Sequence, residues 1–393
     1  MTDERFRAAV LLSHGATSGE VAELLAYTRN RFEQPVNGAI REQPASCEAC
    51  VAAWERYAAE AERVGAVQCL RRRLVQLRFP VTAGMSESAV YRAATRRGVL
   101  RDESLASDGV TFVRPRGVRI FIHPTAAGRI PVVVAEARED FVSLVRALVH
   151  RNEPVRVPES MGACIVAGYN NWDRIAELRA RWEREHHGDR SAAAWRLAFS
   201  ELLPYRERYQ DTFILLSSGP YSAVPASALG LGEGEWLEQS AVIRLEHECT
   251  HYFTRRALGS MRNSLLDEVI ADYMGIVAAA GRYRAEWFLR FMGLESYPRY
   301  RRGGRLENYR GEPPLSNGAF TVLRSLVKSA AERLELFDET RASGAWSPAE
   351  RARVITTLAR LGLETLASAE GGALPGAIAR EAERNAVGGM TSE

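Results

Sequence analysis

Two consecutive helices in the second half of the chain constrain its fold more than any other feature. Over 236–258, apolar residues recur every three or four positions, which predicts one long amphipathic helix. Gly259 follows it, and a glycine just past the last turn commonly ends a helix. Ser264 has Asp267 three residues later, in the manner of a capping box, so a second helix is expected over 264–280. This region must therefore be built from two helices joined by a short turn.

The rest of the sequence predicts a mostly helical α+β protein. Helical spacing recurs in several segments, of which 51–78 is the longest in the first third of the chain. Strands are expected where short, turn-bounded segments are rich in β-branched and other apolar residues, at 110–113, 118–122, 130–134 and 212–216. These strands predict one small β-sheet within a largely helical chain.

Composition excludes several classes of protein. The 52 Lys and Arg residues nearly balance 49 Asp and Glu residues, and a dedicated nucleic-acid binder would need a concentrated basic face. Lys328 is the only lysine. A P-loop site and a Schiff-base mechanism each need a lysine, so neither can be built at any other position of the chain. No apolar stretch approaches the roughly 18–20 residues of a membrane span, and the N-terminus does not resemble a signal peptide. Five cysteines do not suggest a secreted disulfide framework. We expect a cytoplasmic protein with no nucleic-acid or membrane partner.

The first predicted helix carries the sequence His-Glu-Cys-Thr-His at 247–251. Residues four apart lie on the same face of a helix, so His247 and His251 can bind one cation. Glu248 projects near the same metal without binding it, and from there it can take a proton from a metal-activated water. The pattern therefore predicts a catalytic zinc site.

A catalytic zinc site needs a third protein ligand. No histidine follows His251, which excludes the extended motif in which a third, downstream histidine binds the metal. The second predicted helix carries Glu268 and Asp272 four residues apart, hence on one face. Glu268 is the expected ligand, with Asp272 orienting a zinc-bound imidazole through its other nitrogen. Asp267 and Asp272 remain open as alternative third ligands.

Residues 247–272 resemble the gluzincin zinc metallopeptidases, the thermolysin-like group. The resemblance implies that His247, His251 and Glu268 bind zinc, that Glu248 is the general base, and that Asp272 supports a ligand histidine. It also implies a small β-sheet beside the pair of active-site helices, and an edge strand for an extended peptide at 218–224, before the metal helix. The gap between His251 and Glu268 is slightly shorter than in the best-known members.

The resemblance does not by itself identify the residue that donates a hydrogen bond to the tetrahedral oxyanion. The histidine that helps to polarise the substrate carbonyl in thermolysin has no counterpart here, because none follows His251. Tyr309 follows Glu268 by a distance at which gluzincins often place a catalytic tyrosine. Tyr309 is therefore the expected donor, and Arg305 is the second candidate.

Together these features predict a zinc-dependent hydrolase that acts on a peptide or a small amide. Two alternatives stay open: a specialised metalloenzyme for a small biosynthetic amide-type substrate, and an inactive metal-stabilised binding or regulatory module. The predicted organisation is an N-terminal helical and β region (1–155), a zincin-like metal-binding region (156–285) and a C-terminal helical region (286–393).

Overall fold

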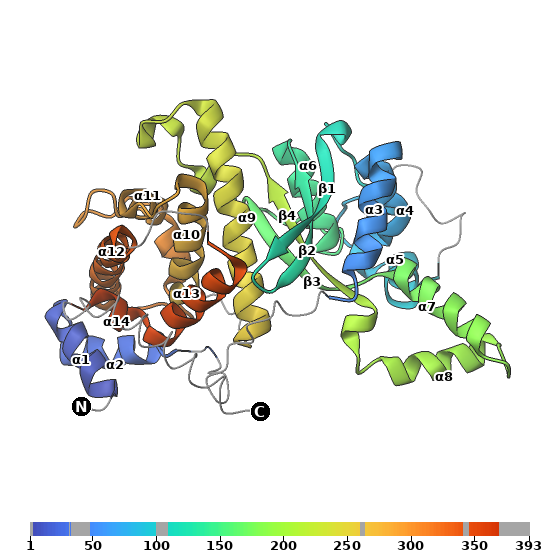
Figure 1. The fold of residues 1–393 in the computed structure, drawn as a ribbon, viewed down its shortest axis with the longest axis horizontal. Helices are drawn as coiled ribbons and strands as arrows, with labels where there is room; N and C mark the ends of the chain where they lie inside the picture. Colours follow the sequence, from blue (N-terminus) through green and yellow to red (C-terminus); the bar gives the residue numbers. More distant parts are fainter. Residues whose placement is uncertain are drawn as a thin grey trace. The chain divides into compact units, whose positions relative to one another are not determined.

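The computed structural model describes residues 3–30, 32, 48–99, 109–259, 264–340 and 346–368. They form the predicted α+β fold, mostly helical with one four-stranded sheet (Figure 1). The described residues divide into two compact units. The first unit draws on 1–45, 125–127 and 220–393, and the second on 46–124 and 128–219. These limits differ from the three regions expected from the sequence.

The first unit is helical, and it contains the helix pair α9 (Glu233–Ala257) and α10 (Leu265–Ala280), which lie side by side (Figure 1). The pair confirms the two helices predicted from the sequence. Ser264 caps α10 by accepting a hydrogen bond from the Asp267 amide at 3.2 Å. The other helices of this unit, with its short 3-10 turns, are α1 (Asp3–Ser13), α2 (Ser18–Tyr27), η6 (Tyr221–Ala223), η7 (Ala226–Leu229), α11 (Ala285–Met292), η8 (Arg305–Tyr309), α12 (Asn317–Glu339), α13 (Pro348–Leu361) and α14 (Leu363–Ala367).

Helix α10 is buried along most of its length, from Leu265 to Val277. It can approach α9 closely because Gly275 has no side chain. A Cβ atom at Gly275 would lie 2.7 Å from the carbonyl oxygen of Ile243 on α9, closer than real Cβ atoms come. Any larger residue there would push the two helices apart. The spacing of the helix pair, and with it the distance between side chains on the two helices, therefore depends on this glycine.

The second unit contains the sheet, whose strand order is β1-β2-β4-β3. Strands β2 and β4 are parallel, with Val132 opposite Ile214, and β3 runs antiparallel to β4. The elements of this unit are α3 (Val51–Val64), α4 (Ala66–Arg73), η1 (Val75–Arg78), η2 (Met85–Glu87), α5 (Ala89–Arg97), η4 (Pro115–Gly117), β1 (Val118–Thr125), β2 (Gly128–Ala135), α6 (Arg138–Leu148), β3 (Ala163–Asn170), α7 (Trp172–Glu185), α8 (Ala192–Leu202), η5 (Arg206–Arg208) and β4 (Gln210–Ser217).

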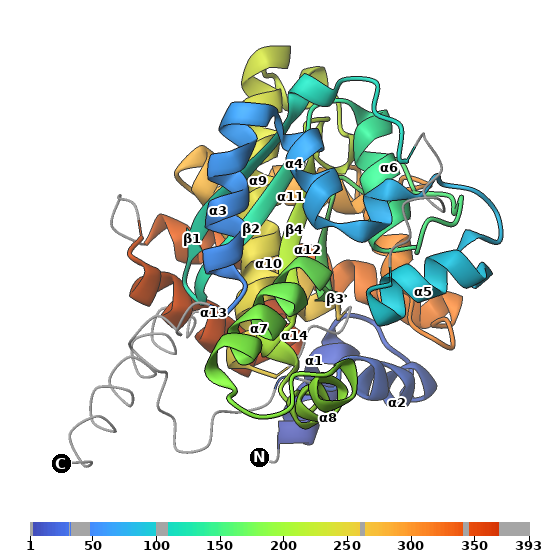
Figure 2. The same cartoon turned by 90° about the vertical axis from the view of Figure 1, so that its right-hand side faces the viewer.

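Helices α3, α4 and α6 cover one face of this sheet, and Figure 2 shows α3 and α4 in front of the strands. Their apolar side chains form one core cluster with alternate residues of the strands, such as Val133, Phe213 and Leu215. The prediction of strands was correct at 118–122, 130–134 and 212–216. It was wrong at 110–113, which forms no strand because its peptide groups turn to other partners, including the Asp140 carboxylate for the amide of Val113.

None of the helices in the described ranges is long and apolar enough to cross a membrane.

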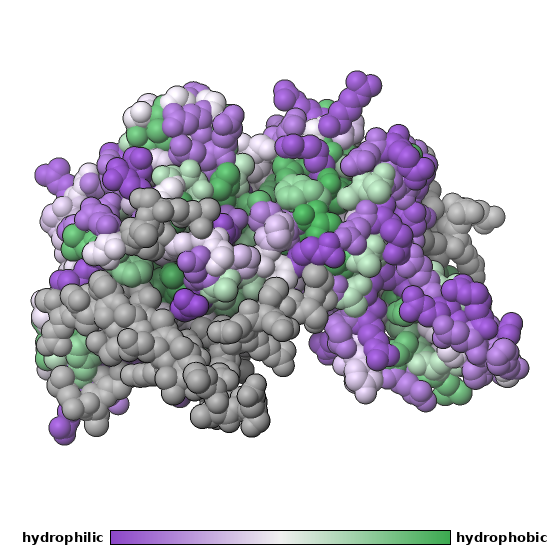
Figure 3. All heavy atoms as spheres, viewed as in Figure 1, coloured by the Kyte–Doolittle hydropathy of each residue, from purple (hydrophilic) through white to green (hydrophobic). Residues whose placement is uncertain are grey.

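Hydrophilic side chains cover much of α7 and α8, and apolar ones are exposed among them (Figure 3). Leu197 on α8 is an example, at 71% exposed.

Candidate metal centre

Helices α9 and α10 bring three potential metal ligands together. The Nε2 atoms of His247 and His251 lie 3.0 Å apart. One carboxylate oxygen of Glu268 lies 3.6 Å from His247 Nε2, and the other lies 3.4 Å from His251 Nε2. One donor atom from each residue therefore falls in a cluster no wider than 4.8 Å. Two imidazole nitrogens and one carboxylate form a donor set that suits zinc.

The other ring nitrogen of each histidine faces a carboxylate from α10. His247 Nδ1 lies 2.8 Å from Asp272 Oδ1, and His251 Nδ1 lies 2.9 Å from Asp267 Oδ2. Hydrogen bonds of this kind fix the orientation and tautomer of an imidazole so that Nε2 is free to bind a metal. The structure thus places Asp267 and Asp272 behind the two histidines, and of the three acidic residues considered as third ligand only Glu268 joins the donor cluster.

Behind His247 lies a second layer, formed by Tyr221 and Arg305. The Tyr221 hydroxyl donates to Asp272 Oδ1 at 2.5 Å and lies 3.0 Å from His247 Nδ1. Arg305 donates to the Tyr221 hydroxyl at 2.9 Å and forms an ion pair with Asp272. Arg305 is therefore engaged behind His247.

The three acidic residues of α10 are buried, with Asp267, Glu268 and Asp272 each no more than 5% exposed. Burying a carboxylate is costly unless it is paired. Although burial opposes ionisation, Arg305 and His247 hold the pKa of Asp272 below its usual range. In the same way, His251 keeps the pKa of Glu268 low against the effect of burial. Both carboxylates are therefore charged, as binding and orienting a metal require.

The cluster favours a positive charge at its centre. Burial disfavours protonation of His251, yet Asp267 raises the pKa of this ring well above its usual value. Four carboxylates, those of Glu248, Asp267, Glu268 and Asp272, surround the two imidazoles, against the guanidinium groups of Arg305 beside Asp272 and of Arg244 near Glu248. A bound divalent cation would offset this excess of negative charge, so the residues present fit a metal ion.

Glu248 and Tyr309 lie next to the donor cluster. Burial raises the pKa of Glu248, while the nearby His247 and His251 lower it. The pKa of Tyr309 is raised by burial and by its charge interaction and hydrogen bond with Glu268. The backbone carbonyl of Tyr309 accepts a hydrogen bond from the Tyr27 hydroxyl at 2.5 Å, which ties η8 to α2. One carboxylate and one phenol are thus available beside the three ligands.

The expected edge strand at 218–224 is wrong. This segment contains the 3-10 turn η6, in which Ser222 and Ala223 have the positive φ angles of 54° and 56°. A backbone with two consecutive residues of that kind cannot pair as an extended strand. The turn instead directs Tyr221 into the second layer of the centre. Nothing in the sequence marks this role, because Tyr221 lies 26 residues before His247.

Residues 9–370 match the model of a family of unknown function, DUF7005. The chain belongs to this family. No curated protein matches the chain, and no solved structure does. For this DUF7005 member, the assignment of a metal centre therefore depends on the donor atoms described above and on the residues that orient them.

Replacing Tyr221 by Phe tests the second layer. The variant keeps the ring but removes the hydroxyl that Asp272 and Arg305 share, so His247 is held less firmly. Removal of such a supporting group typically weakens metal affinity 10- to 100-fold, and we expect a loss of about tenfold. Competition for zinc with a chromogenic chelator measures it. Tyr57→Phe, at a buried tyrosine of the second unit whose hydroxyl donates to Asp173, is the control, and equal affinity in both variants would contradict this role.

Proposed function

We propose that the protein is a zinc-dependent hydrolase that cleaves a peptide or small amide bond. The observation that carries the proposal is the convergence of His247 Nε2, His251 Nε2 and a Glu268 oxygen within 4.8 Å, with both Nδ1 atoms held by carboxylates. Catalytic zinc sites of this type use three protein ligands and leave a further position open. Bound there, zinc supplies Lewis acidity, which polarises a carbonyl group and makes a water molecule far more acidic.

The residues around the ligands have separate tasks in this proposal. Glu248, next to His247 in sequence but not among the donors, takes a proton from the attacking water and later passes it to the leaving amine. Burial raises the pKa of Glu248, which makes its carboxylate a stronger base than a solvated one. The Tyr309 hydroxyl, next to Glu268, donates a hydrogen bond to the carbonyl oxygen as negative charge develops on it.

The assignment of an amide substrate depends on the resemblance of residues 247–272 to gluzincins. It is supported by the presence of a base and a hydroxyl donor next to the metal ligands, because amide hydrolysis needs both groups at one carbon atom. A purely structural metal site would need neither, and such sites are usually closed by a fourth protein ligand.

Metal content and turnover test the proposal together. Protein purified without chelators should contain about one zinc per chain, by mass spectrometry. Hydrolysis of a panel of dipeptides and N-acyl amides should stop on chelation and return when zinc is added. A chain without zinc, or with zinc but no hydrolysis across the panel, would contradict the proposal.

The substitution His251→Gln should lower zinc affinity by more than the 10- to 100-fold typical of supporting residues, because it removes a ligand. His187→Gln, at an exposed histidine between α7 and α8, provides the matched control and should bind zinc like the natural chain. Equal zinc content in the two variants would show that His251 is not a ligand.

A further inference from the structure

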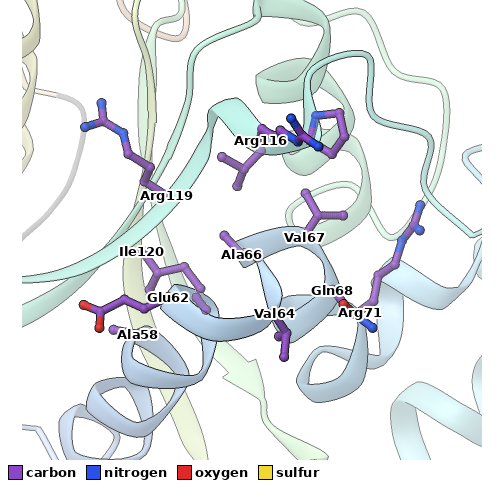
Figure 4. A pocket seen from close by; sticks show the side chains of 14 residues that line it. Ala58, Glu62, Val64, Ala66, Val67, Gln68, Arg71, Arg116, Arg119 and Ile120 are labelled. Atoms are coloured by element: carbon purple, nitrogen blue, oxygen red, sulfur yellow. The ribbon is translucent and has the colours of Figure 1, made fainter.

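Two large cavities differ in what they adjoin. A cavity of about 760 Å³ lies where α3 turns into α4, and its lining residues belong to the second unit alone (Figure 4). The other, of about 1,080 Å³, lies in the first unit and is lined by the end of α2, the start of α10 and the segment 307–315. Tyr309, the proposed oxyanion donor, is part of its wall. Because Tyr309 borders open space, its position depends on the specific contacts that hold it.

Tyr309 is the last residue of η8, a 3-10 helix of five residues. So short a 3-10 helix has few internal hydrogen bonds, and their geometry is poor. Contacts with other elements must therefore fix its place. The first residue of η8, Arg305, is held by its ion pair with Asp272 on α10. The last residue is held by α2.

Tyr27, the last residue of α2, binds the main chain at the end of η8. Its hydroxyl donates a hydrogen bond to the Tyr309 carbonyl oxygen at 2.5 Å. Its ring lies against Gly311, where a Cβ atom would come within 3.2 Å of a ring carbon. Gly311 has a φ of +86°, in the left-handed region that favours glycine. The chain beyond Tyr309 thus packs closely against the Tyr27 side chain.

The same face of α2 holds the far end of this segment. Glu23 lies one turn before Tyr27, and its carboxylate accepts hydrogen bonds from the amide and the hydroxyl of Ser316, at 2.6 and 2.7 Å. Ser316 is the N-cap of α12. Glu20, nearly one turn earlier still, lies so close to Gly318 that a Cβ atom there would overlap its carboxylate. Three side chains on one face of α2 therefore hold the chain from the end of η8 to the start of α12.

A hydrogen bond positions its acceptor only if the donor is itself held, and the end of α2 is. Arg7 on α1 donates to the Leu25 carbonyl at 3.1 Å and to the Thr28 hydroxyl at 2.9 Å. Arg7 also forms an ion pair with Glu364 on α14, which is 1% exposed. Tyr27 lies between Leu25 and Thr28, so it extends from a part of α2 that is tied to two other helices.

We propose that Tyr27 is a positioning residue of the reaction, which holds the main chain of Tyr309 so that the Tyr309 hydroxyl meets the oxyanion. This role rests on the proposed function, in which Tyr309 is the oxyanion donor. A misplacement of about 1 Å can cost a factor of about 10² in rate, so a smaller shift of Tyr309 changes turnover measurably. Because the oxyanion forms in the transition state, loss of the Tyr27 hydroxyl lowers kcat and leaves KM unchanged.

The first experiment compares Tyr27→Phe with the natural chain. Phenylalanine keeps the ring against Gly311 and removes the hydroxyl. For the amide that the natural chain hydrolyses fastest, kcat should fall about tenfold, while KM and zinc affinity stay the same. Tyr209→Phe is the matched control, since it also removes a hydroxyl that donates to a backbone carbonyl, that of Leu203 at 3.1 Å, and it should keep the natural kcat. Normal kcat in Tyr27→Phe, or a loss of zinc affinity, would overturn the inference.

A double variant shows whether Tyr27 acts through Tyr309. Tyr309→Phe alone should lower kcat by a factor of about 10²–10³, as the loss of an oxyanion donor does. If Tyr27 places that hydroxyl, Tyr27→Phe should cause no further loss in a chain that already lacks it. Losses that multiply would overturn the inference, because they would show that the two side chains act independently.

Hydrogen exchange supplies a readout that depends on neither activity nor zinc. In metal-free protein, the amides of 305–311 should exchange faster in Tyr27→Phe than in the natural chain, while those of α9 and α10 stay unchanged. Unchanged exchange at 305–311 would contradict the anchoring role. A natural chain without zinc or turnover would refute the proposed function. A natural chain that hydrolyses the amide, beside a Tyr27→Phe variant with the same kcat, would refute this inference alone.

Discussion

Replacement of Glu248 by Gln should reduce turnover by a factor of about 10²–10⁴ while the protein keeps its zinc. Glutamine has nearly the same size as glutamate but takes no proton from water. Zinc should stay bound because the three donor atoms come from His247, His251 and Glu268. Mass spectrometry of the metal content and steady-state hydrolysis, measured on the same preparation, separate the two effects.

Glu238→Gln is the control for this prediction. It makes the same chemical change on the same helix, at an exposed position nearly three turns earlier, and should leave both zinc content and turnover unchanged. Normal turnover in Glu248→Gln would show that another group accepts the proton. Loss of zinc from that variant would show that Glu248 supports the metal and would place a different residue in the role of base.

The cluster of three candidate metal donors could be predicted from the sequence because their spacing follows from helix geometry. His247 and His251 are one turn apart on α9, and Glu268 and Asp272 are one turn apart on α10, so each pair had to share a face. The sequence left open which acid on α10 joins the histidines. That choice depends on how far α10 is shifted and turned relative to α9, which is set by contacts such as that of Gly275 with Ile243.

The second layer behind His247 could not be found in this way. Tyr221 reaches the centre from a 3-10 turn with positive φ angles at two residues other than glycine, a conformation that local sequence rarely indicates. Arg305 comes from η8, 33 residues after its partner Asp272. Both contacts result from tertiary packing of segments without a periodic pattern. The acidic residue just before Glu268 was a usable signal, and it gave Asp267 as an alternative ligand rather than as a partner of His251.

The strands show the same division between local and tertiary causes. Strands β1, β2 and β4 are rich in β-branched and large apolar residues, so their composition was sufficient to predict them. Strand β3, with the sequence Ala-Cys-Ile-Val-Ala-Gly-Tyr-Asn, contains small residues and a glycine at a register shift, and was not predicted. It exists because it pairs with β4 along its length. Pairing with a strong neighbouring strand thus compensates for weak local preference.

The largest stability effect is expected in the second unit, from Asp211→Ala. Asp211 lies on β4 with no exposed surface. Its carboxylate accepts hydrogen bonds from Trp54 Nε1 at 2.8 Å and from Asn171 Nδ2 at 2.6 Å, and it forms an ion pair with the buried Arg174. Alanine would leave a buried guanidinium group without its counter-charge and the buried Trp54 indole N–H without its acceptor. Breaking a buried pair from one side typically costs about 3–5 kcal/mol, and we expect a loss of that size.

Hydrogen exchange of the β4 amides, followed by mass spectrometry, measures this loss within the unit that contains the mutation. Glu177→Ala is the control, because it also breaks an ion pair of the second unit, that with Arg56, at 2.6 Å. Both side chains of that pair are about half exposed, so water replaces the lost partner, and the expected cost is at most about 1 kcal/mol. The double variant Asp211→Leu with Arg174→Met should recover part of the stability lost in Asp211→Ala, since it leaves no unpaired charge. An equal decrease in the free energy of unfolding in Asp211→Ala and Glu177→Ala would contradict the prediction. It would show that burial does not make the loss of Asp211 more costly than the loss of an exposed partner.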